Sequence, residues 1–96
     1  DSGAYVCAIC AAPTVLGSMG LLKGKKATCY PGHEEKLVGA EVMDADVVRD
    51  GKIITARAAA LSIPFALRLI EAVRGTEAAT MVRNKICYTE NVKEVL

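Results

Sequence analysis

Cys10 is the residue whose type and surroundings are best suited to chemistry. It follows a continuous apolar stretch at residues 4–9. It also precedes Pro13, which suits the first turn of a helix because its missing N–H is no loss there. Ala8 and Ala12 lie two residues to either side, where a sharp strand-to-helix turn requires small side chains. The pattern predicts a nucleophile elbow built around a cysteine; a buried structural cysteine is the other interpretation.

A nucleophile elbow would give the Cys10 sulfur two kinds of help. The first N–H groups of the following helix would face the sulfur and favour the thiolate. The Ala11 N–H would donate to an oxyanion formed on a substrate. Cys10 and Ala11 are therefore the candidate catalytic residues, and attack on a carbonyl carbon is the expected chemistry.

The other cysteines allow two rival interpretations. Cys7 and Cys10 have the C-x-x-C spacing of redox dithiols, and adding Cys29 and His33 gives a spacing similar to that of zinc sites. Cys7 lies inside an apolar strand, however, and residues three apart on a strand face opposite sides. Paired zinc ligands also need a turn between them, so we expect neither a redox dithiol nor a metal. Cys87 is interpreted as a packed or surface thiol.

The composition excludes several classes of protein. The 96 residues are 52% hydrophobic and 24% charged, with a formal net charge of +1, which suits one small domain. Twelve basic against eleven acidic residues, with three tyrosines and one phenylalanine, argue against nucleic-acid binding. No apolar run approaches the length of a membrane span, and no signal-peptide pattern is present.

The cysteine content indicates a cellular compartment, and the first residues raise the question of what precedes them. Four cysteines among long aliphatic runs favour reduced thiols in the cytoplasm over a disulfide scaffold. The chain opens without Met and is already apolar at Ala4. Either a leader is missing or the chain is a piece of a longer polypeptide.

Local signals predict strands, a short helix and a hairpin in residues 4–55. The run at 4–9 shows no alternation, as in a strand buried on both faces of a parallel sheet. A short helix from Pro13 is expected to end between Gly17 and Gly20. The other predicted segments are a strand at 27–29, a loop at 30–33, a helical turn at 34–37, an extended pair at 42–43 and a hairpin at 47–55, which turns at Asp50-Gly51.

Two helices are predicted in the last third of the chain. Ser62 is expected to cap a helix that runs to Arg74, where Gly75 ends it. A second helix is predicted from Thr76 to about Arg83, followed by a tail. The first helix carries an apolar stripe at helical spacing: Ile63, Ala66, Leu67, Ile70 and Val73.

The order strand, helix, strand, hairpin, helix, helix predicts an α/β layered fold. A parallel sheet needs several crossovers to cover both of its faces, and this chain offers about half of them. The stripe on helix 62–74 also needs more sheet surface than the predicted strands provide. We therefore expect a second segment to complete the sheet.

The segment AICAAPTVL at residues 8–16 resembles the nucleophile segment of the ThiJ/PfpI family, in the branch of the parkinsonism-associated deglycase. The match runs in register from about Ala4 to Arg83. It covers only part of the family domain, so residues 1–96 are interpreted as its second, C-terminal half. Further matching segments are LLKGKKAT at 21–28, PGHEEKL at 31–37, VVRDGKIIT at 47–55 and FAL at 65–67.

The resemblance implies a flavodoxin-like, three-layer α/β sandwich with a mostly parallel sheet. Such proteins are related to class I glutamine amidotransferases and are usually homodimers. The resemblance makes Cys10 the reactive, oxidation-prone cysteine; we expect no cofactor. The glutamate that hydrogen-bonds this cysteine in the family belongs to the missing N-terminal half, which we expect as a partner on the same or a separate chain.

The sequence departs from the family pattern at two places near the site. Tyr30 takes a position that is histidine in some members, and a phenol cannot accept a thiol proton near neutral pH. Residues 58–60 are alanines where the family usually has Gly-Pro-Gly after the arginine at Arg57, which puts substrate contact by that loop in doubt. His33 is either a neighbour of the site or a solvent-exposed loop histidine. Tyr30, His33 and Arg57 are thus candidates for a supporting role.

Two functions of different classes follow from the resemblance. The first is an enzyme of deglycase or glyoxalase type, in which the Cys10 thiolate attacks a small reactive carbonyl and forms a hemithioacetal. The second is a non-catalytic, redox-sensing or chaperone-like stress protein, in which Cys10 oxidises to sulfinate and changes partner binding. The family is credited with both.

Overall fold

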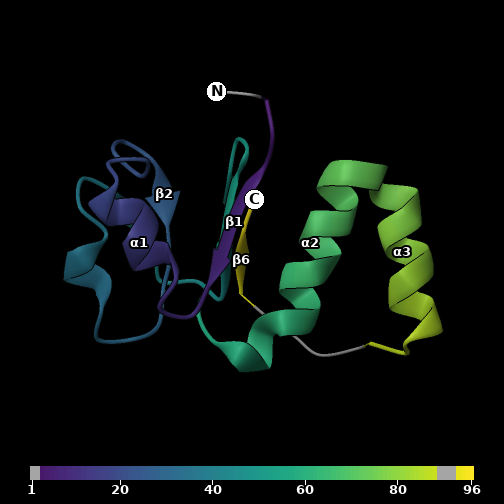
Figure 1. The fold of residues 1–96 in the computed structure, drawn as a ribbon. Helices are drawn as coiled ribbons and strands as arrows, with labels where there is room; N and C mark the ends of the chain where they lie inside the picture. The colour runs from purple at the N-terminus through teal and green to yellow at the C-terminus, as the bar shows by residue number, and fades with distance from the viewer. Residues whose placement is uncertain (1–2, 89–92) are drawn as a thin grey trace.

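The computed structural model describes residues 3–88 and 93–96, arranged around a four-stranded sheet (Figure 1). The strand order in this sheet is β1-β5-β4-β6. β5 runs parallel to β1 and antiparallel to β4, and β6 runs parallel to β4. The strands are β1 at Val6–Ile9, β4 at Val47–Asp50, β5 at Ile53–Ala56 and β6 at Glu94–Val95.

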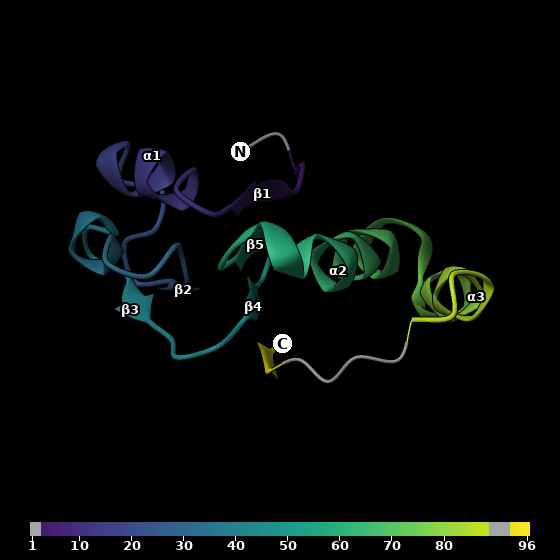
Figure 2. The same cartoon turned by 90° about the horizontal axis from the view of Figure 1, so that it is seen from below.

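The remaining elements lie on the two faces of this sheet. Figure 2 shows α1, β2 and β3 on one side of the β4–β5 hairpin, and α2 and α3 on the other. β2 and β3 pair in parallel as a separate two-stranded sheet. These elements are α1 at Pro13–Ser18, β2 at Lys26–Ala27, the 3-10 turn η1 at Glu34–Lys36, β3 at Glu41–Val42, the 3-10 turn η2 at Ala59–Leu61, α2 at Ser62–Arg74 and α3 at Thr76–Lys85.

The predicted hairpin is confirmed, and its strands divide the interior into two cores. Successive residues of a strand point to opposite faces, so β5 contributes to both cores. On one face, buried Val47, Ile54 and Ala56 pack against Phe65, Leu69 and Ala72 of α2. On the other face, Ile53 packs against a buried cluster of Leu22, Ala27, Cys29 and Leu37.

The second core contains a buried polar contact directly after β2. The Thr28 N–H donates to Thr55 Oγ1 at 3.0 Å, and Thr28 Oγ1 donates to the Ala45 carbonyl at 3.1 Å. A strand was predicted at 27–29. In the structure the strand pairing stops at Ala27.

Helix α2 has the predicted bounds but a different inward face. Ile63 is 47% exposed and Val73 is 63% exposed, so the predicted stripe is wrong at both ends. The sheet instead receives Phe65, Leu69 and Ala72, which are also at helical spacing. Two apolar stripes fit the sequence, and the one that carries the aromatic ring covers the sheet.

The cap of α2 also differs from the prediction. Ser62 is already the first helical residue, and Leu61 occupies the N-cap position without a side-chain cap. Ser62 Oγ donates to the Ala59 carbonyl within η2. The expected end is confirmed, because Gly75 adopts a φ of 95°, which glycine tolerates readily.

Several element bounds differ from the predicted bounds by one or two residues, and β6 was not predicted. β1 begins at Val6 rather than Ala4, β3 covers 41–42 rather than 42–43, and α3 continues to Lys85. β6 had no local signal. In the part of the chain that the structure describes, no helix has the length and apolar character to cross a membrane.

Candidate functional site

Cys10 stands in a sharp turn between β1 and α1. Its φ is 66°, and Cys10 and Cys87 are the two non-glycine residues with positive φ in the described ranges. The left-handed region costs a residue with a Cβ about 1–2 kcal/mol. Two backbone hydrogen bonds hold Cys10 there: its N–H donates to the Ala56 carbonyl at 3.0 Å, and its carbonyl accepts from the Tyr30 N–H at 2.8 Å. The predicted strand-to-helix turn is therefore present at the predicted residue.

The first turn of α1 has already engaged several of its N–H groups. The Ala12 N–H donates to Ile9, the Thr14 N–H to Ala11 and the Val15 N–H to Ala12, all to backbone carbonyls at 3.0–3.2 Å. α1 has only six residues. We therefore expect the first N–H groups of α1 to stabilise a Cys10 thiolate less than the sequence suggested.

Tyr30 and His33 reach the turn through the backbone. Tyr30 binds the Cys10 carbonyl, and the His33 N–H donates in turn to the Tyr30 carbonyl at 3.2 Å. The two rings lie 6.0 Å apart between centroids, tilted by 53°. The Tyr30 ring is 45% exposed, whereas His33 is half-buried. His33 thus lies against Tyr30 rather than free in solvent.

Arg57 begins next to the site, but its side chain forms ion pairs with two aspartates. It follows Ala56, whose carbonyl binds Cys10. Its guanidinium lies 3.1 Å from an Asp44 carboxylate oxygen and 3.8 Å from one of Asp46. The hydrogen bond from Arg57, with the nearby charge of Lys93, lowers the pKa of Asp44. These ion pairs fix the Arg57 side chain at residues 44–46.

Cys29 is a member of this site that the sequence analysis did not place there. The side chain is 2% exposed, and its Sγ donates to the Tyr30 carbonyl at 3.4 Å. Burial, followed by the charges of Glu34 and Cys10, raises the pKa of the Cys29 thiol. Its position directly before Tyr30 was the available signal.

The other two cysteines lie elsewhere. Cys7 pairs with Ile54 in the sheet and packs against the core that faces α2, and burial raises the pKa of its thiol. Cys87 is exposed after α3. Across residues 3–88 and 93–96, no group of three histidines, cysteines or carboxylates is arranged to hold a metal ion.

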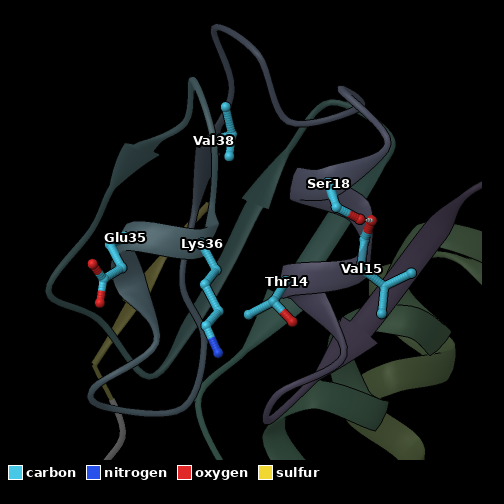
Figure 3. A pocket seen from close by; sticks show the side chains of 6 residues that line it. All are labelled: Thr14, Val15, Ser18, Glu35, Lys36 and Val38. Atoms are coloured by element: carbon cyan, nitrogen blue, oxygen red, sulfur yellow. Dashed lines mark hydrogen bonds between the residues drawn. The ribbon is translucent and has the colours of Figure 1, made fainter.

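A cleft opens beside α1. Its volume is about 460 Å³, and side chains of α1 and of the segment around η1 form its two sides (Figure 3). Cys10 does not line this cleft in the part of the chain that the structure describes. The lining residues are Thr14, Val15, Ser18, Glu35, Lys36 and Val38.

The turn at Cys10 can be compared with known proteins. The model of the DJ-1/PfpI family matches residues 1–72. The chain belongs to this family. Among curated DJ-1/PfpI relatives, Protein DJ-1 homolog B of Arabidopsis thaliana is 42% identical over 88% of this chain and 20% of its own length. Protein dj-1beta of Drosophila melanogaster is 38% identical over 95% of this chain and 50% of its own length. A Caenorhabditis elegans relative named glutathione-independent glyoxalase is 31% identical over 93% and 48%.

Solved DJ-1/PfpI structures have the same fold. A DJ-1 superfamily protein of Salmonella typhimurium superposes with a TM-score of 0.84 at 31% identity, over 93% of this chain and 49% of its own. Toxoplasma gondii DJ-1, described as oxidized, superposes with a TM-score of 0.84 at 34% identity, over 92% of this chain and 48% of its own. The α/β fold with a mostly parallel sheet is confirmed. The chain spans about half the length of most of these relatives, and less of the Arabidopsis protein.

Proposed function

We propose that Cys10 is the nucleophile of a DJ-1/PfpI protein that acts on small reactive carbonyl compounds. The observation that carries this proposal is the positive φ of Cys10 in the turn between β1 and α1. Backbone strain of this kind persists where the surrounding structure enforces it, and it is concentrated at functional sites. The glyoxalase name of the C. elegans relative supports the choice of substrate class.

The proposed step is addition of the Cys10 thiolate to an aldehyde carbon. The sulfur–carbon bond forms as the carbonyl π electrons move to oxygen, which then takes a proton from water and gives a hemithioacetal. The Ala11 N–H is the proposed donor to that oxygen. With a 2-oxoaldehyde, a proton then moves from the former aldehyde carbon to the neighbouring carbon through an enediol, which gives a 2-hydroxy thioester. Attack by water on the thioester carbonyl breaks the carbon–sulfur bond and releases the 2-hydroxy acid and the Cys10 thiol.

The neighbouring residues support the turn rather than move protons. Tyr30 holds the Cys10 carbonyl through its backbone, and its ring lies beside that of His33. Arg57, held by two aspartates, positions the chain after β5. The base that assists Cys10, a glutamate in the family pattern, is proposed to come from the other half of the domain.

The same proposal places that other half against β1. Among the described residues β1 is an edge strand of the sheet, so one side of the strand is open to further pairing. We propose that residues 1–96 form the second half of one domain, that the whole protein is a homodimer, and that it works in the cytoplasm.

Methylglyoxal consumption by the complete protein tests the enzyme proposal. Cys10→Ser should abolish turnover, because a serine hydroxyl, unlike a thiol, forms almost no anion near neutral pH and is a far weaker nucleophile. Cys7→Ser is the matched control, since Cys7 lies in the same strand segment but packs toward α2. Retention of full activity in Cys10→Ser would contradict the proposal.

A redox-sensing role of the same cysteine is the second candidate. It is favoured by the similarity to the Toxoplasma gondii DJ-1 structure described as oxidized. In this role Cys10 oxidises to sulfinate, which adds charge at the turn and changes partner binding. Mass spectrometry of the Cys10 peptide after peroxide treatment tests it: sulfinate without any methylglyoxal turnover would favour this role over the enzyme.

A further inference from the structure

Cys10 and Cys29 are brought together by the backbone although 18 residues separate them. The hydrogen bond from Tyr30 N to the Cys10 carbonyl is 2.8 Å long. With standard bond lengths, this bond keeps the Cα atoms of residues 10 and 29 within about 7.6 Å even when fully stretched, and closer when bent. Disulfides join Cα atoms about 4.4–6.8 Å apart.

The two thiols also affect each other. Cys29 Sγ donates to the carbonyl of Tyr30, the residue whose N–H binds Cys10. The charge of Cys10 contributes to the raised pKa of Cys29, which places both sulfurs in one electrostatic neighbourhood. Cys29 is therefore a second thiol of the Cys10 site.

The two thiols differ in their access to solvent. Cys10 is partly exposed, whereas Cys29 is 2% exposed in the core beneath α1. A small oxidant therefore meets Cys10 first. Neither other cysteine offers the same arrangement: Cys7 packs on the α2 side of the sheet, and Cys87 follows α3 on the far side of α2 (Figure 1).

We propose that Cys29 is the resolving cysteine of Cys10: once a hydroperoxide has oxidised Cys10, Cys29 condenses with it to a Cys10–Cys29 disulfide. The proposal rests on the accessible Cys10 thiol of the proposed function, but not on turnover of a carbonyl. It assigns to Cys29 a chemical role that packing alone does not require.

Both steps balance with a hydroperoxide as the oxidant. The Cys10 thiolate attacks one peroxide oxygen, the O–O bond breaks, and the other oxygen leaves and is protonated; Cys10 becomes a sulfenic acid and the peroxide is reduced. The Cys29 sulfur then attacks the Cys10 sulfur. The S–S bond forms, the S–O bond breaks, and the departing hydroxide takes the Cys29 proton to form water.

The raised pKa of Cys29 makes the second step slow, because the thiolate is the attacking form. Resolution therefore competes with further oxidation of Cys10 to sulfinate. Low peroxide should favour the disulfide, and high peroxide should favour the sulfinate. Cys29 would thus set the peroxide level above which Cys10 is irreversibly oxidised.

The test treats the complete, reduced protein with a small excess of hydrogen peroxide, blocks free thiols and maps tryptic peptides without reduction. Cys29 lies on the peptide at residues 27–36, whereas Cys7 and Cys10 share the peptide that ends at Lys23. Variants must therefore separate Cys7 from Cys10. The cross-linked peptide pair should persist in Cys7→Ser and disappear in Cys10→Ser and in Cys29→Ser.

A second measurement guards against misfolded variants. Cys29→Ser should accumulate Cys10 sulfinate severalfold faster than the parent while keeping the near-UV dichroism of the parent. Absence of the cross-link in the parent, or its persistence in Cys10→Ser, would overturn the proposal. Methylglyoxal turnover of the untreated, reduced parent is measured separately. Turnover without a cross-link after peroxide treatment would refute the role of Cys29, and a cross-link without turnover would refute the enzyme.

Discussion

Arg68 of α2 binds Glu94 of β6 through two parallel hydrogen bonds. Its Nε and one terminal nitrogen lie 2.8 and 2.6 Å from the two carboxylate oxygens, and both side chains are mostly buried. Glu71 accepts a further bond at 3.0 Å. These bonds raise the pKa of Arg68, so it stays charged throughout the accessible pH range. This contact fastens the C-terminal strand to the helix that covers the sheet.

Removing this guanidinium should destabilise the complete protein. Arg68→Ala leaves two partly buried carboxylates without their donor, and we expect a loss of about 2–4 kcal/mol in the free energy of unfolding. Urea denaturation measures it. Arg74→Ala, at an exposed position of the same helix, should change the value by less than about 0.5 kcal/mol. Equal effects of the two changes would mean that the contact contributes nothing.

Gly17→Ala should destabilise the protein although alanine is the better helix former. A Cβ at Gly17 would meet the Lys36 carbonyl and lie 2.9 Å from the Leu37 Cα, both of which are backbone atoms. Helix propensity favours the change by about 1 kcal/mol, whereas overpacking costs about 1–3 kcal/mol, so a net loss is expected. Thermal unfolding would show it as a lower Tm; a higher Tm would mean that η1 moves away freely.

Limited alkylation at pH 6 should rank the four thiols. Cys10 should react fastest, and Cys7 and Cys29 slowest, because burial raises their pKa values and hides their sulfurs. Cys87 serves as the exposed reference thiol. Fragmentation of the shared Cys7/Cys10 peptide separates those two sites. If Cys10 reacts no faster than Cys87, it is an ordinary accessible thiol.

Cys29 should make the fold sensitive to alkaline pH. Its pKa is raised in the folded state, so the stabilisation it provides is complete below the unfolded pKa and is lost as pH rises through the folded pKa. The loss is at most about 1.4 kcal/mol per pH unit. Between pH 7 and pH 10 the urea midpoint should decrease more in the parent than in Cys29→Ala. Cys87→Ala is the control and should behave like the parent.

Tyr30→Phe should change methylglyoxal turnover little. The bond to Cys10 comes from the Tyr30 backbone, which the substitution keeps. Stability should stay within about 0.5 kcal/mol of the parent because Tyr30 lies at the surface, with 45% of the residue exposed. A collapse of turnover would identify the hydroxyl as a catalytic group.

Local signals were sufficient for the elements whose cause is local. Asp50-Gly51 gave the hairpin turn, Gly75 gave the end of α2, and the alanines around Cys10 gave the turn at the site. The inward face of α2 could not be chosen locally, because two stripes fit and the sheet selects between them. β6 pairs with β4 and is bonded to Arg68, 26 residues away, and Cys29 is held near Cys10 by one long-range backbone bond.

The β4–β5 hairpin carries a separate core on each face, and this has a consequence for amide hydrogen exchange. One face of the hairpin packs against the unit of α1, β2 and β3, and the other face packs against the unit of α2 and α3. Either unit can therefore open without unpacking the other. Such units exchange as independent foldons. The amides of Ile54 and Thr55, which no single opening exposes, should therefore be the last in the chain to take up deuterium.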